Sequence, residues 1–341
     1  MKTTSDDIYL SNENGGVLVE HSVLSLEAQT SEYINFISSA GPAYISGKIF
    51  GKQVLVSDES YRLLSPRFPK SAFLPCQYFR PIVLGNTQLE LLPSGESPGA
   101  SFLRIEKKGD SLFYASHWSR QNSAALRRSV FKTSKTLMVR LHKDPSTVFS
   151  VTARRETERF LDFSRKIINA SENLVAVVNT FGEAQNLSYH LENLKIPYSF
   201  DSKLHAVMKS FQETLPAAQC PSWLKEINRY SAESTSPSVI LVSKQHLLQS
   251  RPKSLPDGIW VWIGLDSEEQ LRHPWLSCIA FTDTFLLQDA PDINDLLDMI
   301  RQVNPQQILL FGEGAPNCAT VLARQGHHAE CFSPPRLQTL F

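Results

Sequence analysis

Short apolar stretches separated by polar turns fill the first part of the chain, and longer amphipathic stretches follow them. Before Pro145 the apolar positions alternate with polar ones or form short runs, as in β-strands. After Pro145 the period changes to about 3.6 residues, which is typical of helices. Strands are therefore predicted over residues 8–10, 16–20, 34–37, 53–57, 88–91, 103–106 and 112–114.

The second part of the chain alternates between helical and strand patterns. Phe160, Phe163 and Ile167 fall on one side of a helix predicted over 153–169, and the apolar run 174–178 reads as a strand covered on both faces. This alternation predicts parallel strands with crossover helices. The remaining helices are predicted over 183–194, 293–303 and 315–325, and the strands over 239–242, 259–263, 278–282, 308–311 and 329–332.

Residues 91–120 combine a loop rich in small residues with a predicted hairpin. Leu103 and Ile105 lie on one face of its first strand, and a Lys-Gly-Asp turn leads into a second strand that ends at Ala115-Ser116-His117. The pattern predicts an antiparallel meander with one face buried. Loops at strand ends of this kind often carry functional residues.

Composition narrows the class of protein. A chain of 341 residues with 42% apolar residues can bury a large core, and its length predicts two domains or one domain with an insertion. The 34 basic and 34 acidic residues leave no overall charge to attract nucleic acid, so any such binding needs a local patch.

The cysteines and the apolar segments indicate a cytoplasmic location. The five cysteines are never spaced as C-x-x-C, which fits reduced thiols better than a disulfide framework or a zinc knuckle. No apolar stretch is long enough to span a bilayer, and the first residues lack a secretory pattern. We therefore expect a cytoplasmic protein without a membrane partner.

A local excess of positive charge lies between Ser111 and Lys143, where no acidic residue occurs. Such a stretch either contacts phosphates or forms a solvated face whose acidic partners come from elsewhere in the fold. The absence of interleaved aromatic residues favours the solvated face, and both interpretations stay open. The candidate phosphate-contacting residues are Arg120, Arg127, Arg128, Lys132, Lys135 and Arg140.

Two short motifs have ordinary explanations. Gly95 to Gly99 fits G-x-S-x-G, but Pro98 has no N–H for an oxyanion hole and a strand follows, so the segment reads as a turn. The strand, turn and helix around Gly182 can present helix N-terminal amides to an anion, or can serve close packing alone.

The order of elements resembles the metallo-β-lactamase fold nucleases of the β-CASP group, which includes messenger-RNA 3′-end processing endonucleases, DNA cross-link repair nucleases and exonucleases associated with bacterial DNA ligases. Residues 93–101, PSGESPGAS, are similar to the family loop P-A-G-H-x-x-G-S-A, and residues 182–185, GEAQ, to the turn G-R-A-Q. The resemblance covers residues 8–336. It implies an α/β protein, with an αββα sandwich (1–150 and 271–341) interrupted by a β-CASP-like insertion (151–270).

Nearly every metal ligand of the family is replaced. The family motif T-H-x-H-x-D-H falls on residues 38–44, SSAGPAY, which contain neither histidine nor aspartate. Two zinc ions need several imidazoles and a bridging carboxylate, so we expect neither metal nor any other cofactor. The other family ligand positions are occupied by Glu96, His117, Arg140, Thr284 and Phe311, and the remaining candidate ligands are Glu96, His117 and Asp283.

Three functions remain after this comparison. The first is a catalytically inactive homologue that acts as a scaffold or binding subunit in nucleic-acid processing or repair, with an active nuclease or another protein as its partner. The second is an atypical nuclease or phosphodiesterase in which Glu96 and His117 act as acid and base. The third is a nucleic-acid-binding protein that does not cleave and that uses the basic stretch.

Overall fold

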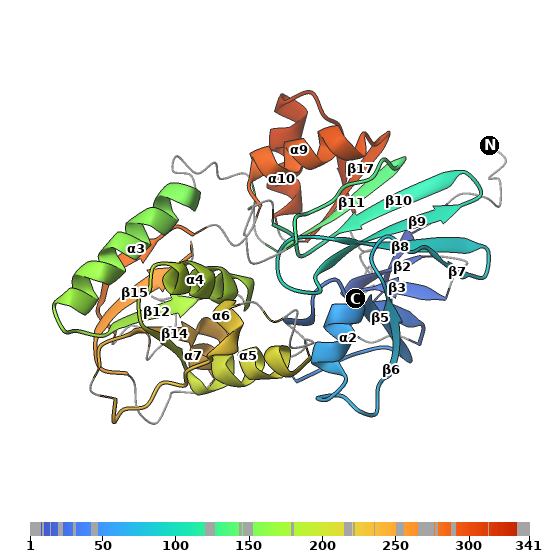
Figure 1. The fold of residues 1–341 in the computed structure, drawn as a ribbon. Helices are drawn as coiled ribbons and strands as arrows, with labels where there is room; N and C mark the ends of the chain where they lie inside the picture. Colours follow the sequence, from blue (N-terminus) through green and yellow to red (C-terminus); the bar gives the residue numbers. More distant parts are fainter. Residues whose placement is uncertain are drawn as a thin grey trace, which may run out of the picture. The chain divides into compact units, whose positions relative to one another are not determined.

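The computed structural model of this chain forms two compact units (Figure 1). The first unit comprises residues 1–122, 127–148 and 290–341, and the second comprises residues 123–126 and 149–289. The residues that the structure describes are 8, 10–13, 15–19, 23–29, 32–41, 47–119, 127–142, 145, 153–178, 181–214, 220, 222–234, 236–249, 256–264, 276, 279–287, 291–312 and 314–332.

The first sheet of the first unit has six strands in sequence order. Strands β3 to β6 run parallel to one another, whereas β1 and β2 form an antiparallel hairpin beside them. Helix α2 (Asp58–Leu64) follows β5, is capped by Ser57 and packs on β5 and β6. The strands are β1 (Leu10–Glu13), β2 (Gly16–Val19), β3 (Leu24–Leu26), β4 (Ile34–Phe36), β5 (Gln53–Ser57) and β6 (Ala72–Cys76).

The second sheet has seven strands in the order β18-β17-β11-β10-β9-β8-β7. Strands β7 to β10 are antiparallel, and β10, β11, β17 and β18 are parallel. Helices α9 (Ile293–Val303) and α10 (Ala315–Arg324) belong to the same unit. The strands are β7 (Ile82–Leu84), β8 (Thr87–Pro93), β9 (Ser101–Lys107), β10 (Asp110–Ala115), β11 (Thr136–Leu141), β17 (Gln307–Gly312) and β18 (Ala329–Cys331).

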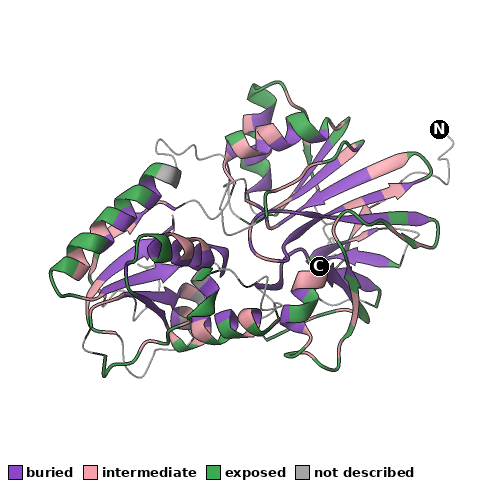
Figure 2. Ribbon diagram, in the orientation of Figure 1, coloured by how far each residue is buried: buried purple, intermediate pink, exposed green. Residues whose placement is uncertain are grey.

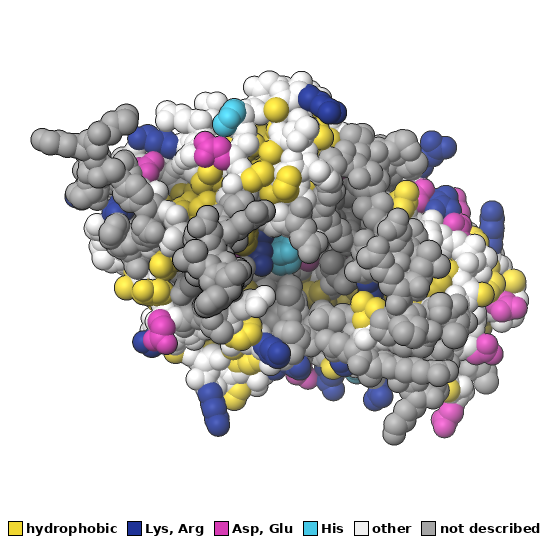
Figure 3. Space-filling view, turned by 180° about the vertical axis from the view of Figure 1, so that it is seen from behind, with side chains coloured by type: hydrophobic (Ala, Val, Ile, Leu, Met, Phe, Trp, Pro, Cys, Tyr) yellow, Lys and Arg dark blue, Asp and Glu magenta, His cyan; other side chains and the backbone are white. Residues whose placement is uncertain are grey.

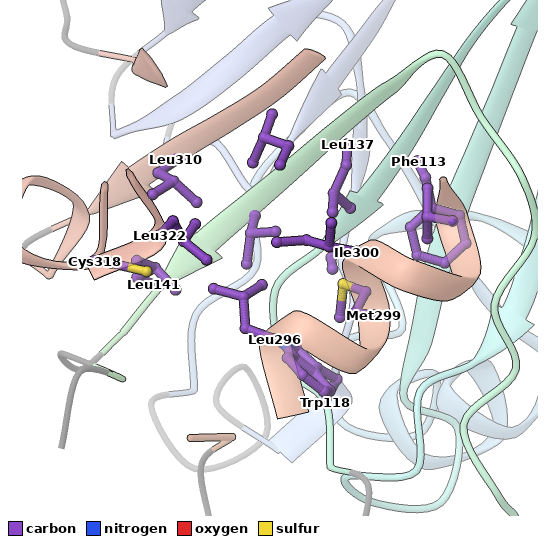
Figure 4. Packing of buried hydrophobic residues seen from close by; sticks show 14 of the residues in the cluster. Phe113, Trp118, Leu137, Leu141, Leu296, Met299, Ile300, Leu310, Cys318 and Leu322 are labelled. Atoms are coloured by element: carbon purple, nitrogen blue, oxygen red, sulfur yellow. The ribbon is translucent and has the colours of Figure 1, made fainter. Parts of the chain in front are cut away.

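Both faces of the second sheet are buried. Leu103 on β9 packs against the first sheet, and its neighbour Phe102 belongs to the cluster that α9 and α10 cover with Met299 and Leu322 (Figures 2 and 4). The expectation of a single buried face was therefore wrong. Alternation along one strand does not reveal that helices more than a hundred residues later cover the second face.

The two sheets of the first unit pack face to face, and α9 and α10 cover the other face of the second sheet. The core between the sheets contains Phe36 and Leu55 from the first sheet and Ile105 and Tyr114 from the second. Phe36 and Tyr114 meet edge to face with ring centroids 6.1 Å apart. The two sheets thus pack through a continuous apolar layer, which holds the strand ends in fixed positions.

The second unit contains a parallel sheet in the order β13-β14-β12-β15-β16. The predicted alternation of parallel strands and helices is confirmed there. The strands are β12 (Leu174–Val178), β13 (Tyr198–Phe200), β14 (Val239–Ser243), β15 (Ile259–Ile263) and β16 (Phe281–Phe285), and the helices are α3 (Ala153–Asn169), α4 (Phe181–Asn193), α5 (Ser202–Thr214), α6 (Ser222–Lys225) and α7 (Lys244–Gln249).

The chain is thus an α/β protein whose described strands form three sheets. The second unit extends to Asp289, whereas the sequence placed the end of the insertion at residue 270, because β16 pairs with β15. The strand predicted over 278–282 lies instead at Phe281–Phe285. No helix in the described part of the chain is long and apolar enough to cross a membrane.

Candidate functional site

A cluster of polar side chains lies at one end of the two-sheet core in the first unit. Glu27 follows β3, Ser38 follows β4, and Ser116 follows β10. Parallel neighbouring strands bring their carboxyl ends to the same edge of each sheet, so residues that are distant in sequence meet there. The apolar layer ends at Tyr114, and hydrogen bonds replace hydrophobic contacts beyond it.

Glu27 is the centre of this cluster, and its side chain is 10% exposed. Its Oε1 accepts hydrogen bonds from the Ser38 backbone N–H at 3.3 Å and from the Ser38 hydroxyl. Its Oε2 accepts from the Tyr114 hydroxyl at 3.0 Å and the Ser116 hydroxyl at 2.5 Å. The buried carboxylate is therefore hydrogen-bonded on both oxygens, which offsets the cost of removing it from water.

Arg140 on β11 supplies the positive charge of the cluster. Its Nη1 donates to Glu27 Oε2 at 3.3 Å and to the Glu27 carbonyl oxygen at 3.2 Å. The guanidinium also lies over the Phe311 ring, 5.4 Å from its centroid, because β11 and β17 pair with these two residues in register. Arg140 thus joins the two sheets at this end of the core.

Two histidines extend the cluster outward. His142 Nε2 lies 2.9 Å from the Ser116 hydroxyl oxygen. The His142 ring stacks on that of His117, with centroids 4.1 Å apart and an interplanar angle of 17°. Hydrogen bonds and ring stacking therefore connect Glu27, Ser116, His142 and His117 in one continuous arrangement.

The protonation states follow from these neighbours. Burial by itself raises the pKa of Glu27, but the positive fields of His117 and Arg140 outweigh it and lower that pKa to about 2. Burial, reinforced by His117, lowers the pKa of His142. His142 also keeps solvent contact on its outer side, so water moderates this effect. At neutral pH the cluster holds an ionised Glu27 and a neutral His142.

This proton arrangement excludes Ser116 as an activated nucleophile. Ser116 has one hydroxyl proton, which it donates to the ionised Glu27. His142 must then carry a proton on Nε2 and donate it to the Ser116 oxygen. A general base would have to accept the serine proton, so this serine and histidine do not form a catalytic pair.

Glu96 lies in a second hydrogen-bonded group close to the first. Its Oε2 accepts from the Ser39 hydroxyl at 3.0 Å and the Ser97 hydroxyl at 2.6 Å. The loop 93–101 that carries it is fixed to α2, where the Gly99 carbonyl accepts from Ser57 and Ser60 at 2.7 and 2.9 Å. Glu96 is therefore held by its surroundings and already has hydrogen-bond partners.

The structure brings only some of the candidate residues Glu96, His117 and Asp283 near one another. Ser94 connects the loop of Glu96 with His117 by donating a 2.7 Å hydrogen bond to the His117 carbonyl oxygen. The hydrogen bonds of the described residues include none between the Glu96 and His117 side chains. Asp283 lies in the second unit, where it forms an ion pair with Arg159 at 2.7 Å.

Three residues of the basic stretch have acidic partners from elsewhere in the fold. Arg127 pairs with Glu59 at 3.0 Å, Lys132 pairs with Glu90 at 2.6 Å, and Arg140 pairs with Glu27. Basic and acidic side chains are interspersed on the face shown in Figure 3. Arg128 and Lys135 are exposed and form no ion pair with the described residues, and Arg120 lies outside them.

Sequence reasoning missed Glu27 and His142, the residues that define the site together with Arg140. Glu27 follows a three-residue strand that no clear pattern marks, and His142 comes directly after the last residue of β11, in a stretch that offered only scattered histidines. Within the described ranges no group of three or more His, Cys, Asp or Glu side chains is arranged to hold a metal ion.

Comparisons with known proteins add a fold but no activity. No protein-family model and no curated protein matches the chain. Among solved structures, the chain is similar to a protein of unknown function from Enterococcus faecalis V583, with a TM-score of 0.55 and 12% identity. The match covers 98% of this chain and 81% of that one. At this level of identity the similarity concerns the fold alone.

Proposed function

We propose that this chain is a catalytically inactive relative of the metallo-β-lactamase fold nucleases of the β-CASP group. The two packed sheets of the first unit, with α9 and α10 on the second of them, and the parallel α/β unit inserted between its strands support this assignment. The loop 93–101 supports it further, because its glycines and prolines persist although its histidine is replaced by Glu96. We propose a scaffold or binding subunit in nucleic-acid processing or repair.

The ion pair between Arg140 and Glu27 is the observation that carries this proposal. In the resemblance, Arg140 stands where active relatives have an acidic metal ligand, and Phe311 stands where they have a histidine. A guanidinium at that position repels a divalent cation. It also offers only N–H hydrogen-bond donors, whereas a metal ligand must supply a lone pair. Glu27 has both carboxylate oxygens engaged by protein donors, so it offers no free ligand.

Metal content of the purified protein tests the loss of the metal centre. The protein is purified without chelators from zinc-supplemented cells, and its zinc is measured by inductively coupled plasma mass spectrometry. We expect well below one zinc ion per chain. An authentic two-zinc enzyme prepared in parallel fixes the sensitivity. A content close to two zinc ions per chain would contradict the proposal, because that is the stoichiometry of a two-metal hydrolase.

The partner requires a separate experiment. Inactive members of this superfamily pair with active homologues, and fold-level analogy extends that arrangement to this chain. Affinity purification from the native cell is expected to recover a nuclease or another nucleic-acid processing protein at near-equal amounts. Recovery of the chain alone, with no enriched protein, would argue against a scaffold role while leaving the metal result untouched.

An atypical hydrolase remains the alternative. Glu96 and His117 lie on segments that Ser94 connects, which is the observation in its favour. The alternative predicts phosphodiesterase or nuclease activity that disappears in His117→Ala. Absence of activity with magnesium, manganese or zinc would exclude it.

A further inference from the structure

The fold brings aromatic side chains beside the basic stretch. Tyr78 and Phe79 lie in the turn between β6 and β7, with ring centroids 6.4 Å apart. The Arg127 guanidinium lies over the Tyr78 ring, 5.6 Å from its centroid, which is a cation–π distance. The basic stretch has no aromatic residues interleaved at a spacing for base stacking, so the turn supplies from another part of the chain what the stretch lacks.

Strand β8 explains why these two segments meet. The Phe79 N–H donates to the Leu91 carbonyl oxygen at 3.0 Å. The Val130 N–H donates to the Pro93 carbonyl oxygen, also at 3.0 Å. Carbonyl groups two residues apart point to the same edge of a strand and lie about 7 Å from each other. The aromatic turn and the segment of the basic stretch that contains Arg128 are therefore fixed side by side along one edge of β8.

Phe79 exposes its ring on a left-handed backbone. Its φ is +64°, a region that bulky residues rarely adopt, and the residue is 49% exposed. Tyr78, in contrast, packs against the core between the two sheets and donates its hydroxyl proton to the Ala100 carbonyl oxygen at 2.9 Å. Unfavourable backbone positions of this kind gather at binding and catalytic sites, where surrounding contacts keep them in place. The turn thus presents Phe79 to solvent, and Tyr78 anchors it.

Uncompensated positive charge accompanies this ring. Arg80 follows Phe79 directly, and Arg128 follows Arg127. Arg80 and Arg128 are both exposed, and neither forms an ion pair with the residues that the structure describes. The carboxylate of Glu59 is already engaged, because it pairs with Arg127 at 3.0 Å and accepts a backbone N–H at 2.9 Å. The surface therefore offers an exposed ring with two cations, and phosphate groups complement that charge.

We propose that Phe79, Arg80 and Arg128 form a binding surface for single-stranded nucleic acid. A base stacks on the exposed Phe79 ring, and the two guanidinium groups contact neighbouring phosphates. A duplex would meet the cations alone, because its bases are stacked inside the helix. A ring beside two unpaired cations favours alternating bases and phosphates over an apolar protein face. This inference deepens the proposed function and rests on it, because it assigns the nucleic acid that such a subunit holds to a stated surface.

Fluorescence anisotropy of the full chain with labelled single-stranded DNA and RNA oligonucleotides tests this surface. Phe79→Asn is expected to weaken binding roughly fivefold or more, the effect of losing one base stacked on a ring. Asparagine tolerates the left-handed backbone, so thermal unfolding of this variant should occur at or above the wild-type temperature. Phe79→Trp should retain the wild-type affinity, because an indole ring also stacks on bases.

Tyr33→Asn is the matched control. Tyr33 is 36% exposed and precedes β4, whereas Phe79 follows β6. Strands β4 and β6 are parallel to each other through β5, so the two aromatic residues lie at opposite ends of the first sheet. The control should bind the oligonucleotides as wild type does. An equal loss of affinity in Tyr33→Asn and Phe79→Asn would contradict a specific role for Phe79.

Salt dependence and base content separate stacking from charge. Arg80→Gln should lower the slope of log affinity against log salt by about one, whereas Phe79→Asn should leave that slope unchanged. An oligonucleotide of the same length that lacks its bases keeps its phosphates but cannot stack. Wild type should bind this oligonucleotide more weakly than the intact one, and Phe79→Asn should weaken its binding no further.

Two results would overturn the inference: absence of oligonucleotide binding by wild type at low salt, and unchanged affinity in Phe79→Asn. A co-purifying protein that is lost in Phe79→Asn, when wild type binds no oligonucleotide, would overturn it as well and assign the surface to a protein partner. Zinc content tests the proposed function separately. Two zinc ions per chain would contradict an inactive homologue, whereas oligonucleotide binding that depends on Phe79 would still support this surface.

Discussion

Glu27 and Arg140 are 113 residues apart in sequence and come from different sheets, yet Arg140 Nη1 lies 3.3 Å from Glu27 Oε2. The pair closes one end of the core with side chains that are 10% and 21% exposed, respectively. A pair with so little solvent contact holds two opposite charges that each depend on the other. Its removal therefore provides a direct test of what the cluster contributes to stability.

Breaking this ion pair should be costly. Glu27→Gln or Arg140→Gln is expected to lower the free energy of unfolding by about 3 kcal/mol, because each leaves an uncompensated buried charge. The double variant should lose less than the sum of the two, as measured by urea unfolding.

An exposed pair offers a matched control for that measurement. Lys52 and Glu32 lie 2.8 Å apart, but their side chains are 69% and 82% exposed. Lys52→Gln should leave the urea midpoint nearly unchanged, because solvent screens an exposed pair. An equal cost for the two pairs would contradict the importance assigned to the buried one.

Acid should destabilise the protein in two steps. The pKa of His142 is below its usual 6.5, so below that pH the unfolded chain takes up a proton that the native state rejects, and stability falls. The pKa of Glu27 is also lowered, so a second loss begins below its usual 4.5, where the unfolded carboxylate becomes protonated while the native one stays ionised. Urea midpoints between pH 8 and pH 2 measure both steps.

His142→Gln should flatten the first step of this pH dependence and leave the second. His328→Gln should leave both steps unchanged, since its side chain lies outside the cluster. Wild-type midpoints that stay constant from pH 8 to pH 2 would contradict the lowered pKa of both Glu27 and His142.

The loop that carries Glu96 depends on Gly99. Its φ is +83°, and a Cβ there would lie 2.6 Å from the Ser60 nitrogen, so Gly99→Ala should separate the loop from α2. Gly109 has a similar φ of +85° with no atom within 4 Å of an added Cβ, so Gly109→Ala carries only the conformational cost of about 1 kcal/mol. Thermal unfolding should show a clearly larger loss for Gly99→Ala, and equal losses would argue against close packing of this loop.

The exposed part of the basic stretch should dominate any binding of nucleic acid. Arg128→Glu is expected to weaken binding of a single-stranded oligonucleotide more than Arg127→Glu, because Glu59 already pairs with Arg127. Loss of one phosphate contact should lower the slope of log affinity against log salt by about one. Fluorescence anisotropy over a series of salt concentrations measures both, and no effect of either change would show that these side chains only solvate the surface.

Gln185 in α4 is fully buried, and neither atom of its amide has a hydrogen-bond partner among the described residues. Gln185→Leu should therefore leave stability unchanged or raise it by about 1 kcal/mol. Asn35 is buried as deeply but exchanges hydrogen bonds with Ala28 and donates to the Phe50 carbonyl, so Asn35→Leu should be strongly destabilising. Chemical unfolding compares the two, and a large loss in Gln185→Leu would reveal a partner for that amide.

Local patterns predicted much of the fold. The helix at Ala153–Asn169, the strand at Leu174–Val178 and the helix at Ile293–Val303 have the predicted bounds, because each has a strong periodicity or an unbroken apolar run. Short α2 was not predicted, and β16 lies three residues later than expected, since neither has a strong pattern of its own. Of the residues named from the sequence, His117 and Arg140 lie in the Glu27 cluster, whereas Glu96 lies in a separate hydrogen-bonded group.

The sequence by itself determined the α/β class and the parallel direction of the strands in the second unit. Only the tertiary structure decided that Glu27 meets Arg140 and that His142 stacks on His117. The physical reason is that periodicity records which side of an element is apolar, whereas ion pairing and ring stacking depend on which distant strand ends share an edge. The helices that cover a sheet set the burial of its side chains, and neighbouring charges set their protonation. Both depend on distant parts of the chain, so a single segment does not reveal them.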